Sequence, residues 1–164
     1  MSRRLVFIVL LACLAGCAKP DLPATVIHAG SISELNAQRA ELGGLFPAGQ
    51  LQDFDTALKE IKLDAMNRGI ATADARDREL LGLVNGRTVR LVENLGWQMR
   101  RSRLLGEIKL MSELLEQDLK RQHATAATGT PESVTTHLQN ERDILGRLQR
   151  DLEDTEAKLA GWNH

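Results

Sequence analysis

The chain has 164 residues, with 21 Lys and Arg against 22 Asp and Glu, so its formal net charge is only −1. This balance does not favour a nucleic acid or another polyanion as the partner of the whole protein. Aromatic residues make up 3% of the sequence and tyrosine is absent, which argues against a stacking platform for sugars or single-stranded nucleic acid.

The first residues have the layout of an export signal. Arg3 and Arg4 are followed at once by an almost entirely aliphatic run from Leu5 to Leu14. A helix that spans a membrane needs roughly 20 apolar residues, and Pro20 interrupts the sequence before that length is reached. A basic start followed by a short apolar core predicts a signal that is removed.

The apolar run ends in Leu14-Ala15-Gly16-Cys17, which resembles the lipobox of bacterial lipoproteins. The resemblance implies that residues 1–16 are cleaved off and that Cys17 becomes the lipidated first residue of the mature protein. Two or more acyl chains anchor a protein stably. The alternative is a buried or disulfide-bonded Cys17 in a secreted domain, but Cys13 leaves with the signal, so no internal disulfide is then possible.

The same resemblance suggests a destination. In the sorting rule of enteric bacteria, an Asp after the lipidated cysteine retains a lipoprotein in the inner membrane, and this chain has Ala18 there. We therefore expect the outer membrane, facing the periplasm, although Lys19 affects sorting in some lineages. Nucleic acid is not an expected partner in that compartment.

The segment after the cysteine is predicted to be a tether. Residues 17–30 contain two prolines and show no sustained period, so we expect flexible, partly extended coil. At about 3.1 Å per residue, such a chain would lift the first helix by about 40 Å. Residues 25–28 have strand-forming side chains, but no other segment offers them a pairing partner.

Residues 31–86 are predicted to form a small helical region. Ser31 and Glu34 match a capping box, which starts a helix that runs to about Leu42. A second helix begins near Pro47 and closes at about residue 69, and a third covers residues 72–84. The second has one apolar face with steps of three and four, made of Leu51, Phe54, Leu58, Ile61 and Ala65.

Residues 87–164 are predicted to form two long helices. Asn85-Gly86 makes a turn, Thr88 caps the next helix, and that helix continues from Val89 to about Gln122, with Gly96 and Gly106 as sites where it could bend. The sequence ATAATGT at 124–130 interrupts it, and Thr130-Pro131-Glu132 starts the last helix.

The last helix has the most regular pattern in the chain. Its apolar residues keep heptad spacing, with Glu141 and Thr155 in the gaps: Val134, Leu138, Leu145, Leu148, Leu152, Leu159 and Trp162. This predicts a coiled-coil strand that folds back antiparallel on residues 97–122, either within one chain or between two. The predicted fold is therefore all-α, a small helical domain followed by an antiparallel coiled-coil hairpin.

Two segments carry a second resemblance. FDTALKEI (54–61) and LVNGRTVRLV (83–92) are similar to a family of small bacterial lipoproteins known as a domain of unknown function. In that family a Phe-x-x-Ala-x-x-x-Ile helix precedes a Leu-x-Gly-Lys-Thr segment. The similarity covers residues 31–107. Here Arg87 replaces the lysine, Arg90-Leu91 stands where acidic residues are usual, and the family implies no catalytic residue.

The sequence offers no recognised catalytic, cofactor or metal motif. The NGRT segment lacks the glycine spacing and lysine of a phosphate loop, and no serine lies in a known nucleophile motif. The histidines, His28, His123, His137 and His164, are spread along the chain rather than paired as in zinc sites, although His123 and His137 flank one loop. Carboxylate pairs such as Asp53 and Asp55, or Asp74 and Asp77, fall on polar helix faces, where solvation is the simpler explanation.

One basic cluster is a candidate contact patch. Arg100, Arg101 and Arg103 lie within MRRSR at 99–103, and arginine binds phosphates and carboxylates with paired hydrogen bonds. Lipid phosphates, lipopolysaccharide or an acidic protein would be suitable partners. The alternative is a solvated face balanced by Glu107 and nearby acids.

These patterns together suggest a non-enzymatic, lipid-anchored envelope protein. Its coiled coil would bind another envelope protein or a second copy of itself, and it would need no cofactor. A module that binds a small ligand, lipid or cell-wall fragment in a cleft of the helical region is the alternative, and an enzyme ranks third.

Overall fold

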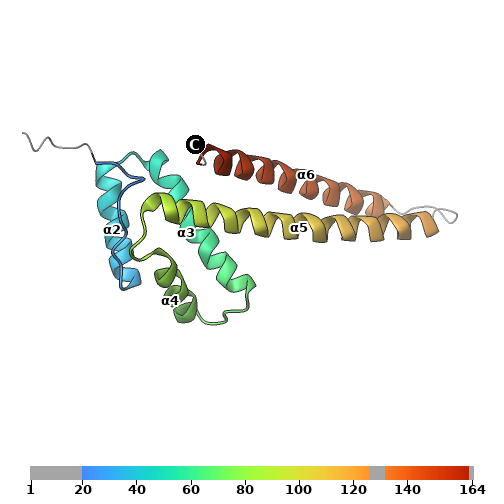
Figure 1. Cartoon of the computed structure of the whole chain (residues 1–164). Helices are drawn as coiled ribbons and strands as arrows, with labels where there is room; N and C mark the ends of the chain where they lie inside the picture. Colours follow the sequence, from blue (N-terminus) through green and yellow to red (C-terminus); the bar gives the residue numbers. More distant parts are fainter. Residues whose placement is uncertain (1–19, 126–131, 163–164) are drawn as a thin grey trace, which may run out of the picture.

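The computed structural model describes residues 20–125 and 132–162. Within these ranges the chain folds into helices, so the predicted all-α class is confirmed (Figure 1). Cys17, Thr130, Pro131 and His164 lie outside the described residues. The helices are α2 (Ile32–Leu45), α3 (Ala48–Asn67), α4 (Ala73–Val84), α5 (Val89–Thr125) and α6 (Glu132–Gly161).

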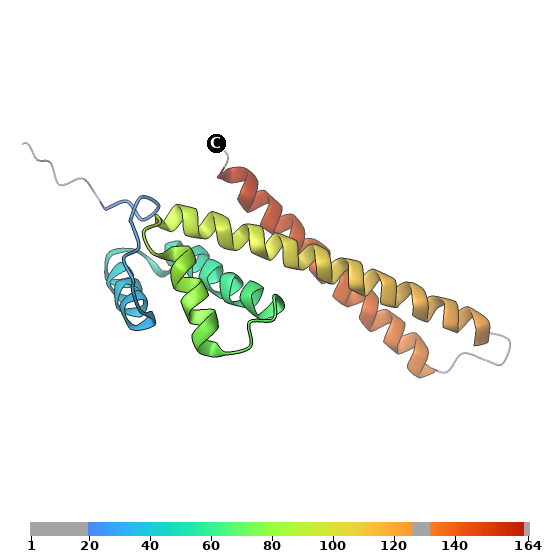
Figure 2. The same ribbon diagram turned by 60° about the horizontal axis from the view of Figure 1, so that its bottom comes forward.

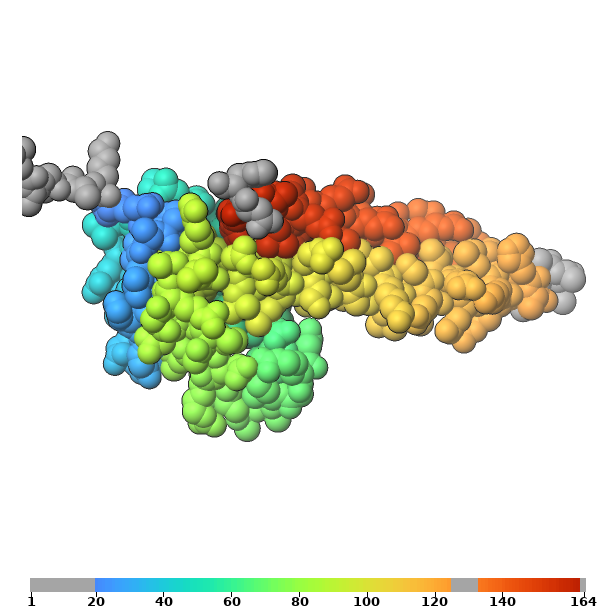
Figure 3. Space-filling model, viewed as in Figure 1, coloured from blue at the N-terminus to red at the C-terminus, as the bar shows by residue number. Residues whose placement is uncertain are grey.

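The long helix α5 is the common axis of the molecule. Helices α2, α3 and α4 gather around its N-terminal part, and α6 returns along the rest of it in the antiparallel sense (Figures 1 and 2). The space-filling view shows α6 lying directly against α5, with the pair projecting from the small helical domain (Figure 3). None of the described helices has an apolar stretch long enough to cross a bilayer.

The core of the small domain lies where α3 meets α5. The predicted apolar face of α3 is confirmed, because Phe54, Ala57 and Ile61 are completely buried. On α5, Val89 and Val92 are also completely buried and belong to the same cluster. Helices α2 and α4 add further buried aliphatic side chains, namely Leu35, Leu42, Leu80 and Val84.

A glycine sets the distance between α3 and α5. A Cβ atom at Gly96 would lie only 2.3 Å from the Ala57 Cα atom and 2.8 Å from its carbonyl oxygen. The backbones of α3 and α5 therefore touch at Gly96, where the side chain of any larger residue would clash with Ala57. Helix α5 runs without interruption through both Gly96 and Gly106, and no atom lies within 4 Å of a Cβ at Gly106.

The segment before α2 is not the flexible tether that the sequence suggested, as far as it is described. Leu22, Ile27 and Ala29 are buried in the core, and Val26 forms an antiparallel bridge with Thr88. The Ile27 amide donates to the Arg87 carbonyl at 2.8 Å. The prediction failed because the pairing partner is the turn at residues 86–89, which is too short to be recognised in the sequence as a strand.

The predicted helix starts and turns are largely confirmed. The Ser31 hydroxyl accepts from the Glu34 amide at 3.2 Å, while the Glu34 carboxylate accepts from the Gly30 amide, one residue before the position expected for a capping box. Gly86 has φ 76°, which a glycine adopts at no steric cost. Thr88 accepts from the Leu91 amide at 3.3 Å and caps α5.

In the structure of the single chain, α5 and α6 pack against each other as an antiparallel hairpin. The heptad face of α6 turns toward α5, with Leu138 at 2% and Thr155 at 0% exposure. Leu104 of α5 is buried opposite it. The two polar residues in the heptad seam, Glu141 and Thr155, are thus buried like Leu138, whereas Leu145, Leu148, Leu152 and Leu159 are only partly buried.

Candidate functional site

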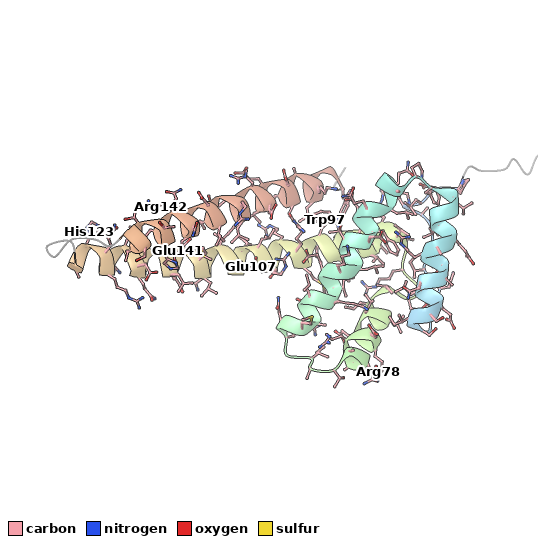
Figure 4. All side chains as sticks on the ribbon, turned by 180° about the vertical axis from the view of Figure 1, so that it is seen from behind. Arg78, Trp97, Glu107, His123, Glu141 and Arg142 are labelled. Atoms are coloured by element: carbon pink, nitrogen blue, oxygen red, sulfur yellow. The ribbon has the colours of Figure 1, made fainter. Side chains whose placement is uncertain are left out.

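The C-terminal end of α6 contacts the small domain through a cluster of residues from α3, α5 and the end of the chain. We call this cluster the junction: Asp53, Glu60, Trp97, Arg100, Arg103, Thr155, Lys158 and Trp162. At its centre the residue Trp97 is 7% exposed. The Lys158 Nζ lies 4.7 Å and the Arg100 guanidinium 5.4 Å from the Trp97 ring, and Trp162 meets it edge to face at 6.4 Å. Lys158 also forms an ion pair with Asp53 of α3. Figure 4 labels Trp97 at this end of the hairpin.

Glu60 of α3 is the anion of the junction. It is 4% exposed and accepts from Arg103 at 2.8 and 3.0 Å and from Arg100 at 3.2 Å. Arg100 also donates to the Thr155 hydroxyl at 3.2 Å, which in turn donates to the Asp151 carbonyl. Hydrogen bonds from Arg103 to Glu60, and further bonding to Glu107, raise the pKa of the Arg103 guanidinium despite its partial burial.

This geometry corrects the predicted contact patch. Arg100 and Arg103 point into the protein and neutralise Glu60, so they do not form an exposed cluster with Arg101. Only Arg101 remains on the surface, with a side chain 48% exposed and paired to Glu156 at 2.8 Å. The sequence could not reveal this, because the acid that attracts the two arginines lies about 40 residues earlier on another helix.

Three of the four acidic residues considered as possible catalytic pairs, Asp53, Asp55 and Asp77, have ion-pair partners on other helices. Asp55 binds Arg39 of α2, with its Oδ1 and Oδ2 atoms 2.9 and 2.5 Å from the guanidinium nitrogens. Asp77 of α4 lies 2.7 Å from Lys62 of α3. These ion pairs link neighbouring helices, which differs from the solvated role that the sequence suggested, whereas Asp74 is exposed as expected.

A second buried acid, Glu93, lies on α5 beside the junction. Its residue is 8% exposed. Burial, with a smaller contribution from the nearby Asp53 carboxylate, raises the pKa of Glu93 to about 7, against the opposing attraction of Lys158 and Arg90. No pattern in the sequence pointed to this raised pKa of Glu93, because its cause is burial against other helices.

Farther along the hairpin, Asp118, His137 and Glu141 form a cluster that the sequence analysis missed. The partners of His137 are carboxylates: its Nε2 atom lies 3.2 Å from Asp118 Oδ2 and 3.4 Å from Glu141 Oε1. One ligand atom from each residue lies within 4.8 Å of the others. The signal that could have revealed it is the pair His137 and Glu141, one helical turn apart at the edge of the heptad seam.

The small domain also has a surface pocket between α2, α3 and α4, with a volume of about 260 Å³. Its floor is apolar, with Leu35, Leu58 and Leu80, and its rim carries Arg39 and Lys62. Both of these cations are paired, with Asp55 and Asp77 respectively. The pocket is slightly smaller than most sites for small molecules, which start at roughly 300 Å³.

Comparison with known proteins does not assign this chain to a family. No protein-family model, no curated protein and no solved structure matches this chain. The resemblance of residues 31–107 to small bacterial lipoproteins therefore stays a prediction from the sequence.

Proposed function

We propose that this chain is a lipid-anchored protein of the bacterial envelope that acts through its helical hairpin as a non-enzymatic interaction module. Anchoring is inferred from the signal-like start and the lipobox-like Leu14-Ala15-Gly16-Cys17. Because Leu22, Ile27 and Ala29 are buried in the core, the folded domain begins only a few residues after Cys17 in the sequence. The helical domain would then sit close to the lipid surface, much nearer than the tether predicted from sequence implied.

The observation that carries the interaction role is a pair of exposed leucines one turn apart on α5, Leu110 and Leu114, which we call the apolar strip. Gly96, Arg103 and Leu110 lie at intervals of seven, so they share one face of the helix. Helix α3 covers this face at Gly96 and at Arg103, and it ends at Asn67. Beyond that end the strip is uncovered, with Leu110 59% and Leu114 40% exposed.

Exposed apolar side chains that extend a buried face favour contact with another protein surface. The strip lies on a different side of α5 from the seam with Leu104 that α6 covers, so both can be occupied at once. The mature chain is mildly acidic, since loss of Arg3 and Arg4 leaves 19 basic against 22 acidic residues. A partner with an aliphatic groove fits the strip better than a nucleic acid does.

Site-specific photocrosslinking in cells tests this function. A photoreactive residue at Leu110 or Leu114 should give a discrete crosslinked product in the membrane fraction. Arg147, which is exposed on α6, provides the matched control and should give none. Size-exclusion chromatography with light scattering distinguishes self-association from binding to a different protein. A strictly monomeric protein with no crosslinked product at either leucine would contradict the proposal.

The pocket between α2, α3 and α4 supports a second candidate function, binding of a small ligand, lipid or cell-wall fragment. Its apolar floor suits an amphiphilic molecule, whose acidic group would replace Asp55 or Asp77 as the partner of Arg39 or Lys62. The discriminating measurement is a thermal-shift series with lipids and wall fragments, using Leu58→Gln as the control variant. A melting temperature that no compound changes would rule this candidate out.

A further inference from the structure

The cluster of Asp118, His137 and Glu141 holds three potential metal ligands on two helices. His137 and Glu141 lie one turn apart on α6, so their side chains share one face. Asp118 reaches them from α5, and its other carboxylate oxygen, Oδ1, accepts from Arg121 Nη1 at 2.9 Å. Such a bond fixes the direction of the remaining oxygen, as outer hydrogen bonds do around metal ligands in general.

The spacing of the ligand atoms fits a tetrahedral ion. Zinc binds histidine nitrogen and carboxylate oxygen at about 2.0–2.2 Å, and tetrahedral ligands at that distance are about 3.3 Å apart. The His137 Nε2 atom lies 3.2 Å from Asp118 Oδ2 and 3.4 Å from Glu141 Oε1. The ligand oxygens of Asp118 and Glu141 lie within 4.8 Å of each other, so a shift of these two carboxylates by up to about 1.5 Å would complete the tetrahedral spacing.

Burial provides an independent reason to expect a cation at this place. The Glu141 side chain is only 8% exposed, and its Oε2 atom is buried without a hydrogen-bond partner among the described residues. It occupies a heptad position where an aliphatic residue would pack without this cost. His137 is 62% exposed and borders a surface pocket of about 290 Å³. A metal ion could therefore enter from solvent, and a fourth coordination position would face water.

We propose that Asp118, His137 and Glu141 form a binding site for a divalent transition-metal ion, with Zn²⁺ as the best match. One imidazole and two carboxylates suit zinc, whereas Mg²⁺ and Ca²⁺ prefer oxygen ligands alone. The bound ion neutralises the two carboxylates and joins α5 to α6 in the half of the hairpin that lies away from the small domain, where Figure 4 labels Glu141. This site is independent of the proposed interaction role.

Titration of the purified, chelator-treated full chain with ZnCl₂ tests the proposal. Calorimetry should give one ion per chain, and Zn²⁺ should raise the melting temperature while MgCl₂ leaves it unchanged. Mutations of residues that only hydrogen-bond to a metal's ligands already lower metal affinity 10- to 100-fold. His137→Gln and Asp118→Asn remove ligands themselves, so they should lower the affinity for Zn²⁺ at least 100-fold. His123→Gln, an exposed histidine of the same hairpin, should bind like the unaltered chain.

Glu141→Leu separates metal binding from folding. Leucine completes the heptad seam, so this variant should melt at a higher temperature than the unaltered metal-free chain and should no longer respond to Zn²⁺. Equal zinc affinity in His137→Gln and His123→Gln, or an unchanged zinc response in Glu141→Leu, would overturn the site. Absence of saturable binding by the unaltered chain would overturn it as well.

Discussion

Replacement of Gly96 by alanine is the sharpest test of how α5 is held against the small domain. In an open helix this change stabilises a protein by up to about 1 kcal/mol, because alanine is the better helix former. Here the added methyl group would lie 2.3 Å from the Ala57 Cα atom and 2.4 Å from its Cβ atom. Ordinary contact begins near 3.4 Å, so α3 and α5 must separate by about 1 Å.

The cost of that separation follows from what lies in the interface. Phe54, Ala57 and Ile61 of α3 are completely buried, and the atoms that clash belong to backbone, which cannot turn aside as a side chain can. Insertion of a methyl group into a well-packed core costs about 1–3 kcal/mol. With the upper part of that range and the gain in helix propensity, we expect Gly96→Ala to lower the free energy of unfolding by about 2 kcal/mol.

Gly106→Ala is the matched control on the same helix, because no atom lies within 4 Å of its added Cβ. It should raise the free energy of unfolding by up to about 1 kcal/mol. Urea denaturation followed by circular dichroism measures both variants, with unchanged m-values as the check that only stability differs. If Gly96→Ala stabilises the protein as much as Gly106→Ala does, the close approach of α3 and α5 is wrong.

Three further predictions concern Glu93, Glu60 and the lipid anchor at Cys17. Folding raises the pKa of Glu93 from 4.5 to about 7, so the folded state binds an extra proton between these two pH values. The free energy of unfolding should therefore fall as the pH rises through that window, by up to about 3 kcal/mol. Urea titrations at several pH values should show that the free energy of unfolding of Glu93→Gln depends less on pH. Glu60→Ala leaves Arg100 and Arg103 without their shared acid and should cost about 3–5 kcal/mol, whereas Glu107→Ala, at an exposed partner of Arg103, should change the urea midpoint little; equal effects would contradict the junction. Cys17→Ala should leave the helical spectrum unchanged and release the protein from membranes, and a variant that still sediments with them would refute lipid anchoring.

The parts of the fold that depend on neighbours in the chain could be predicted from the sequence. The apolar face of α3, the caps at Ser31 and Thr88 and the turn at Gly86 follow from local periodicity and backbone preference, which act over a few residues. The heptad face of α6 was predicted for the same reason. Local patterns also indicated that α5 and α6 pair, because a short connection between two apolar faces favours an antiparallel hairpin.

The contacts that give the molecule its chemistry come from residues far apart in the chain. Arg100 and Arg103 have the composition of a surface patch, and only the position of α3 delivers Glu60 to them. His137 has only Glu141 as a ligand-like neighbour on α6 until α5 brings Asp118 beside them. The segment around Ile27 looks like a free tether because its partner, residues 86–89, becomes an edge only after α5 and the preceding turn are in place.

The sequence by itself therefore determined the helices, their buried faces and the lipobox-like cysteine, since these depend on spacing along one segment. Tertiary structure alone decided which charges are buried, which apolar strip at Leu110 and Leu114 stays uncovered and where three ligand atoms converge. The physical reason is that burial and ion pairing depend on distances between helices, and those distances are set by contacts such as that of Gly96 with Ala57, which no pattern within one helix encodes.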